Sequence, residues 1–188
     1  KQGGQSLMQI SRQILLTISL FILTSCLQKQ KPTRVDVKIR PMDEKVFWEI
    51  LTNFAWETKD EKLTIQPAID ILSKFEIEDI YKFDDILSEK LYLLDGPAFA
   101  SNFVDVKNES QYLSTDLFLY SRCYVIAGGQ ECFQKVLADP KQMSTKGTFE
   151  GLLYIASFAY EKKTGSDKYE HPPKFNYETY GNNKAWGQ

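Results

Sequence analysis

The stretch DLFLYSRCYVIAGG, residues 116–129, decides the fold of this chain. From position 117 to position 127 only Ser121 and Arg122 are clearly polar, so a helix here is apolar on nearly every face. Such a helix lies in the middle of a domain and is covered by other helices. Gly128-Gly129 then supplies a stop, because glycine adopts the left-handed conformation that a helix end needs. The stretch therefore predicts a buried central helix over residues 116–127.

The segments around this helix repeat apolar residues every three or four positions, which is the spacing of an amphipathic helix. Pro67 allows two interpretations of its segment: the helix begins near Thr64 with proline in the first turn, or it is kinked. Residues 98–104 form a short helix or a turn, and no stretch reads convincingly as a strand. The predicted fold is all-α, a compact bundle of about six helices around the central one, with further helices at 43–58, 61–75, 76–94, 131–138 and 147–163.

The composition narrows the classes of function. The 188 residues carry a formal net charge of −2, which leaves no sign of the basic surface that binds nucleic acid. The single histidine, His171, argues against a histidine-rich metal site and against a Ser-His-Asp triad, while carboxylate chemistry stays open. We therefore predict a protein that is not an enzyme, holds no metal or cofactor, and does not bind nucleic acid.

The N-terminal residues are typical of a secretory signal. We expect translation to begin at Met8, followed by Arg12 and an apolar run over 14–23 that is too short to cross a bilayer core of roughly 30 Å. The next residues, Leu23-Thr24-Ser25-Cys26, resemble the lipobox of bacterial lipoproteins. The resemblance implies that the peptide is cut before Cys26 and that this cysteine carries a lipid. The alternatives are an uncleaved N-terminal helix and an ordinary signal peptide with an incidental cysteine.

The chain then divides into four parts with different compositions. The polar stretch after the cysteine is a simple spacer or a basic segment that lies against anionic headgroups. The C-terminal tail has few aliphatic residues, so it is disordered or wraps the domain through its aromatic rings. We predict an exported, membrane-anchored protein of the bacterial cell envelope with a leader and signal peptide at 1–25, a lipid-anchored tether at 26–41, a helical domain at 42–165 and an irregular tail at 166–188.

Several different short motifs lie along residues 42–165: Phe47-Trp48, Glu78, Ile80, Phe83, Arg122, Tyr124-Val125-Ile126, Gly128-Gly129, Asp139-Pro140, Leu152-Leu153-Tyr154 and Ala159-Tyr160 before Thr164-Gly165. Together they resemble the bacterial domain of unknown function family 4240. Its most distinctive motif is an arginine that enters an aromatic-aliphatic helix ending in glycine. Family members often read Phe-Arg-x-Trp-Leu-Ile there, and this chain has Ser121 and Tyr124 at the aromatic positions. The family brings no established activity, so the resemblance leaves the function open.

An arginine inside a buried helix needs a partner for its charge. Arg122 is either part of a structural ion pair or an anchor for an anionic ligand. The ligand interpretation requires a cleft that Tyr120, Tyr124 and Trp48 line around it. The ion-pair interpretation requires a carboxylate from among Asp116, Asp84, Asp95 and Glu131.

Asp84 and Asp85 belong to the most acidic of the predicted helices. Adjacent residues on a helix point about 100° apart, so the two do not chelate an ion together. Asp85 and Glu89 are four residues apart and are able to share one, although a solvated charged face is the simpler interpretation. We keep Asp84 and Asp85 as candidate contacts for a ligand or partner.

Cys123 and Cys132 lie nine residues apart across the glycine pair. A disulfide forms between them if the chain reverses there and the protein is exported. Otherwise both pack as small apolar side chains. A catalytic cysteine requires a base to activate it, and His171 is the one histidine available for that.

Two functional hypotheses of different class follow from these patterns. The first is a non-enzymatic, membrane-anchored binding protein that captures a protein partner in the envelope, in an immunity-type or inhibitor role. The second is a small-ligand or enzymatic domain that uses Arg122 with neighbouring tyrosines and carboxylates. The sequence contains no evident nucleophile–base pair, which favours the first hypothesis.

Overall fold

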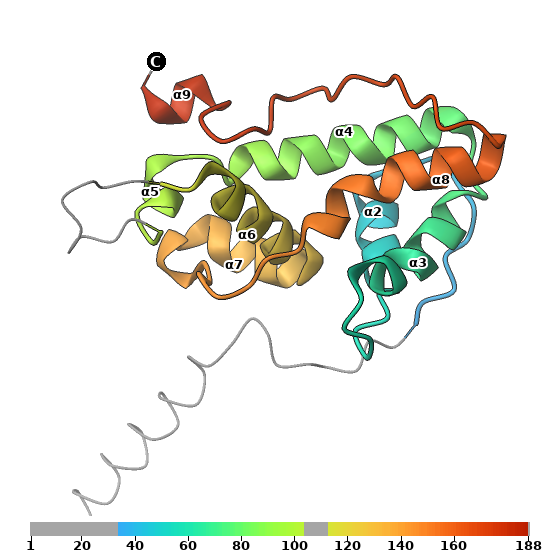
Figure 1. Cartoon of the computed structure of the whole chain (residues 1–188), viewed down its shortest axis with the longest axis horizontal. Coiled ribbons are helices and arrows are strands. Elements are labelled where there is room, and N and C mark those ends of the chain that lie inside the picture. Colours follow the sequence, from blue (N-terminus) through green and yellow to red (C-terminus); the bar gives the residue numbers. More distant parts are fainter. Residues whose placement is uncertain (1–33, 104–112, 188) are drawn as a thin grey trace, which may run out of the picture. The chain divides into compact units, whose positions relative to one another are not determined.

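The computed structural model describes residues 34–103 and 113–187, and within them it contains helices and connecting segments but no strand (Figure 1). The all-α prediction is confirmed. The predicted leader, Met8 and Cys26 lie outside the described residues. None of the helices in these two ranges has the length and hydrophobicity that crossing a membrane requires. The helices are α2 (Glu44–Leu51), α3 (Glu61–Leu72), α4 (Ile77–Leu93), α5 (Pro97–Ala100), α6 (Thr115–Ala127), α7 (Gln130–Ala138), α8 (Ile155–Thr164) and α9 (Asn183–Trp186), with 3-10 helices η1 (Pro140–Gln142) and η2 (Glu150–Tyr154).

Helix α6 is the buried central helix that the sequence predicts. Ser114 Oγ accepts a hydrogen bond from Leu117 N at 3.4 Å and caps the first turn. The interior of the helix is buried, including Arg122, and its neighbours are α4, α7 and η2. Gly129, at a φ of 91°, then turns the chain into α7, a backbone conformation that suits glycine.

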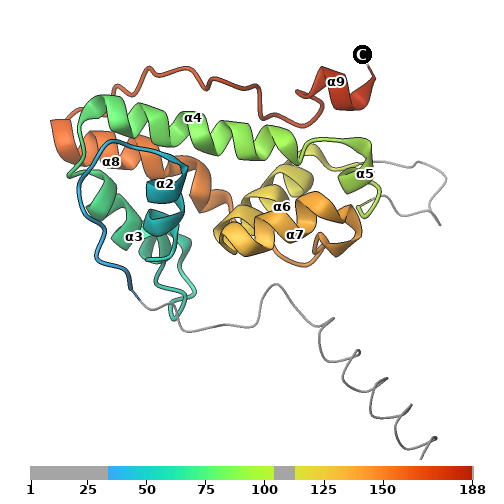
Figure 2. The same ribbon diagram turned by 180° about the vertical axis from the view of Figure 1, so that it is seen from behind.

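The other helices pack on one another, in part through aromatic contacts. Helices α3 and α8 lie side by side, and α4 contacts α2, α6 and α8. The ring centroids of Phe47 and Phe83 are 4.9 Å apart and join α2 to α4, while those of Trp48 and Phe133 are 5.6 Å apart and join α2 to α7. Figure 2 shows α2 beside α3 and α4, on the side that faces away in Figure 1.

The predicted helix over 43–58 is too long, because α2 ends at Leu51. The side-chain amide of Asn53 donates to Glu49 O at 2.9 Å. In a continuing helix the main-chain N–H of the same residue would bond that carbonyl. The helix therefore ends in a turn, beyond which Phe54 still reaches the core.

The two interpretations of 61–75 are resolved by the cap of α3. Asp60 Oδ1 accepts from Lys62 N at 2.8 Å, which starts the helix well before Pro67. The proline lies inside the helix, so the alternative start near Thr64 is wrong. The helix also ends three residues earlier than predicted.

The predicted helix over 147–163 begins differently in the structure. A 3-10 helix, η2, precedes α8. Glu61 Oε2 accepts from Gly151 N at 2.8 Å, and Phe149 N donates to Tyr120 O at 3.0 Å. These bonds tie the entry of η2 to α3 and α6 in place of an α-helical first turn.

After α8 the chain turns back, runs along α4 and ends in α9 (Figures 1 and 2). Residues 169–182, here called the C-terminal segment, contact α4 and α6 through hydrogen bonds at several points along their length. Of the two interpretations of the tail, the structure therefore shows the one in which it wraps the domain.

Candidate functional site

The fold encloses the side chain of Arg122 completely. Its Nη1 donates to Leu91 O at 3.1 Å and to Tyr177 O at 3.0 Å, and its Nη2 donates to Thr179 Oγ1 at 3.1 Å. The guanidinium carbon lies 4.7 Å from the centroid of the Phe118 ring. The terminal nitrogens thus join α6 to α4 and to the C-terminal segment.

Asp95 is the carboxylate that faces Arg122. Its Oδ1 lies 3.9 Å from Nη1, and both side chains are fully buried. The same carboxylate accepts from Asn182 N at 2.9 Å and from Tyr180 N at 3.3 Å. Burial lowers the pKa of Arg122, and the nearby Asp95 opposes that shift. This geometry is that of a structural ion pair.

The other residues that the ligand interpretation placed around Arg122 lie apart from it. Trp48 packs on α7, and the ring of Tyr124 lies against Gly147. Tyr120 stands beside η2, where its carbonyl accepts a main-chain hydrogen bond. The described structure does not bring these side chains together as a cleft around an accessible guanidinium.

Asp84 and Asp85 both contact the C-terminal segment. The hydroxyl of Tyr169 donates to Asp84 Oδ2 at 2.9 Å, and His171 Nε2 lies 2.9 Å from Asp85 Oδ1. Burial raises the pKa of Asp84, and the hydrogen bond from Tyr169 opposes this rise. The two carboxylates therefore hold another part of the chain, and the interpretation as a solvated face does not describe them.

Tyr169 and His171 belong to a group of four rings that contact one another, which we call the tyrosine–histidine cluster: Tyr81, Tyr160, Tyr169 and His171. The rings of Tyr81 and His171 stack, with centroids 4.5 Å apart and planes 11° apart. Tyr169 lies 5.7 Å from Tyr81 and 5.6 Å from Tyr160, measured between centroids. The cluster joins α4, α8 and the C-terminal segment. Sequence reasoning missed it, although the two-residue spacing of Tyr169 and His171 suits an extended chain that turns alternate side chains to one surface.

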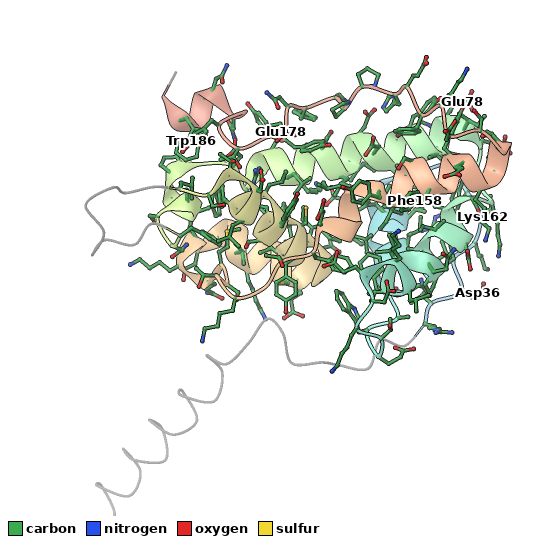
Figure 3. All side chains as sticks on the ribbon, in the orientation of Figure 1. Asp36, Glu78, Phe158, Lys162, Glu178 and Trp186 are labelled. Carbon is green, nitrogen blue, oxygen red and sulfur yellow. The ribbon has the colours of Figure 1, made fainter. Side chains whose placement is uncertain are left out.

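A second feature is a groove between two helices, the α3–α8 groove, lined by Lys62, Ile65, Gln66, Ile69, Phe158, Glu161, Lys162 and Gly165. Ile65 and Ile69 are buried at its floor. Lys162 Nζ lies 2.5 Å from Asp70 Oδ1 at the rim. The ring of Phe158 stacks on Tyr154 with centroids 5.8 Å apart, and Figure 3 shows Phe158 and Lys162 on α8.

Residues 42–162 match the family model described as Protein of unknown function (DUF4240). The chain belongs to this family. No curated protein and no solved structure matches it. The DUF4240 match contains Arg122, Asp84 and Asp85, yet it ends before the C-terminal segment that supplies their partners.

The two cysteines of the DUF4240 region lie in the interior. No disulfide joins Cys123 to Cys132, and both side chains are buried. Burial raises the pKa of Cys123, and the nearby Arg122 opposes that rise. A thiol that stays protonated is a poor nucleophile, so Cys123 has the properties of a packing residue.

The candidate residues of this DUF4240 domain differ in what surrounds them. Within the described residues no three histidine, cysteine, aspartate or glutamate side chains gather as ligands for a metal ion. Asp84 and Asp85 hold rings of the C-terminal segment, and Asp95 holds its main chain. The α3–α8 groove, by contrast, presents an apolar floor with charged residues at its rim.

Proposed function

We propose that this protein is a lipoprotein, anchored through Cys26, whose helical domain binds a protein partner in the cell envelope. The short apolar run that ends in Leu23-Thr24-Ser25-Cys26 supports the anchor. The polar residues that follow let the domain stand away from the membrane. An immunity-type or inhibitor role would use the α3–α8 groove to bind the partner protein.

The α3–α8 groove is the observation that carries the binding part of this proposal. Its floor is formed by Ile65 and Ile69, and Phe158 stands at its edge. Phe158 stacks on Tyr154, which is 43% exposed to solvent. Phe158 itself is half-buried, and aromatic residues are among those that contribute most to protein interfaces.

The charges at the rim indicate the chemistry of the partner. Lys162 is paired with Asp70, whereas the ammonium of Lys62 has no hydrogen bond or ion pair with any residue that the structure describes. An amphipathic helix presents an apolar stripe between polar flanks and fits a groove of this kind. We propose a partner helix whose apolar stripe lies in the groove against Phe158 and whose acidic flank meets Lys62.

Photo-crosslinking in the natural host tests the groove. A photoreactive residue at position 158 of the full chain should give a cross-linked product, and one at position 137, exposed on α7, should not give the same product. The charge reversal Lys62→Glu should abolish the product, while the matched reversal Lys141→Glu on η1 should leave it unchanged. A product that forms equally from both positions, or that survives Lys62→Glu, contradicts the proposal.

Intact mass and cell fractionation of the natural protein test the anchor. The unchanged chain should appear in the membrane fraction with a lipid-sized mass increase on Cys26, and Cys26→Ala should abolish both. An unmodified cytosolic protein that starts at Met8 overturns the lipoprotein proposal. The cross-linking experiment tests the groove independently of the anchor, because its product depends on the groove and not on the lipid.

A further inference from the structure

The C-terminal segment lies on the domain in the manner of a bound extended peptide. Along residues 169–179 the partly buried positions are Tyr169, His171, Phe175, Tyr177 and Thr179, and the positions between them are exposed. Apart from Pro173, which is exposed, this is the period of two of an extended chain over a surface, with alternate side chains facing inward. Figures 1 and 2 both show the segment beside α4.

The domain contacts the main chain of the segment at several points along its length. Arg122 donates to the carbonyl of Tyr177, and Asp95 accepts from the N–H of Asn182. The hydroxyl of Ser88 accepts a longer bond from Phe175 N at 3.4 Å. The three recognising side chains are fully buried. Main-chain hydrogen bonds of this kind give affinity without regard to the peptide sequence.

Side-chain contacts add selectivity at the N-terminal end of the segment. Asp84 accepts from the Tyr169 hydroxyl, and Asp85 contacts the His171 imidazole. The same imidazole stacks on Tyr81. The two rings, Tyr169 and His171, are two residues apart in the chain. Two adjacent carboxylates and the face of the Tyr81 ring bind them.

We propose that the surface formed by Asp84, Asp85, Ser88, Asp95 and Arg122, here called the α4 slot, is a binding site for an extended peptide. The C-terminal segment occupies it in cis. The ligand in trans is a polypeptide segment with tyrosine and histidine two residues apart, followed by extended main chain. The slot is separate from the α3–α8 groove, and this inference does not rest on the proposed function.

Because Arg122 and Asp95 are buried, the slot is not left empty, and a competing peptide must take the place of the C-terminal segment. Without a peptide, Arg122 and Asp95 would keep each other at 3.9 Å and would lose the main-chain partners that the segment gives them. Buried charges without hydrogen-bond partners are strongly unfavourable. A competing peptide replaces those bonds. Gly165, at a φ of 75°, ends α8 and begins the short connection to the segment.

The test uses the full chain and a synthetic peptide of residues 166–188 with a fluorescent label. Tyr169→Phe and His171→Ala together, made in the protein only, weaken the cis occupant. This variant should bind the peptide at least tenfold more tightly than the unchanged protein, as measured by fluorescence anisotropy. Adding Asp95→Asn should reverse that gain. Glu131→Gln on α7, an exposed residue outside both the slot and the groove, is the matched control for the carboxylate-to-amide change and should leave the peptide affinity unchanged.

Several results overturn the proposal. One is a folded variant with native helical circular dichroism that shows no saturable binding, and another is a scrambled peptide that binds equally well. Dimers that form without peptide would assign the slot to the segment of a second copy and would also overturn it. If the variant does not fold, the unchanged protein gives the answer by hydrogen exchange. Excess peptide should accelerate exchange at the amides of the protein's own C-terminal segment, and no acceleration overturns the proposal.

Discussion

The ring of Tyr124 on α6 occupies the space that a side chain at Gly147 would need. Gly147 precedes η2, so this contact lets the chain pass close to the central helix. We expect Gly147→Ala to destabilise the protein by about 1–3 kcal/mol, because an added methyl must push the ring aside. Urea unfolding measures the change. In a Tyr124→Ala background the same substitution should cost much less, and an equal cost in both backgrounds would show that the ring is not the obstacle.

Arg122→Met should destabilise the domain far more than the loss of a surface ion pair. The substitution leaves the buried Asp95 without its cationic neighbour, and breaking such a pair costs about 3–5 kcal/mol. The control is Glu131→Gln, which breaks the exposed pair with Lys135 and should change the free energy of unfolding far less, because solvent screens exposed pairs. Denaturant unfolding compares the two. Similar losses in both variants would mean that Arg122 is not the structural centre described above.

The raised pKa of Asp84 predicts a specific dependence of stability on pH. The folded state holds the Asp84 proton more tightly than the unfolded state does, since burial raises the pKa above its usual value of 3.8. The free energy of unfolding should therefore fall as pH rises from that value through the raised pKa. Asp84→Asn should remove this fall when unfolding is measured between about pH 4 and pH 8.

Asp70 provides a control of opposite sign for that experiment. The hydrogen bond from Lys162 lowers the pKa of Asp70, so its contribution to stability is present above the usual pKa and is lost as pH falls through the lowered one. Asp70→Asn should remove a loss of stability on the acid side. Profiles that change in the same direction for both variants would contradict the assignments.

Local hydrogen exchange should separate the anchors of the C-terminal segment. Asp95→Asn weakens the acceptor of two amides, so exchange at Tyr180 and Asn182 should accelerate while Phe175 changes little. Ser88→Ala removes the acceptor of Phe175 N and should give the reverse pattern. Uniform acceleration along the segment in both variants would show that it detaches as one unit.

The sequence predicts the helices whose signals are local. The central helix was predictable because its residues are apolar all round and its ends carry a serine cap and a glycine pair. The end of α2 was missed because the Asn53 side chain takes a carbonyl that a longer helix would use. The start of α8 was missed because η2 depends on Glu61, ninety residues before Gly151, and periodicity contains no such information.

The candidate site was predictable in its individual residues and not in its arrangement. Arg122, Asp84 and Asp85 stand out because charge is unusual within or beside apolar helical faces. Their partners, Tyr177, Tyr169 and His171, come from a segment with few aliphatic residues, and local pattern does not say where such a segment packs. Trp48, Tyr120 and Tyr124 were grouped with Arg122 by chemistry alone, and the fold sends them elsewhere.

During synthesis on the ribosome, Arg122 is made before the C-terminal residues that bind it. Helices α2 to α8 emerge before residues 177–182, so the guanidinium and Asp95 are synthesised well ahead of the main-chain groups that complete their bonds. Vectorial synthesis therefore leaves the middle of the domain with incompletely satisfied charges until its C-terminal residues arrive. A nascent chain stalled after α8 should be more sensitive to protease than the finished one, because its core closes only when the C-terminal segment docks.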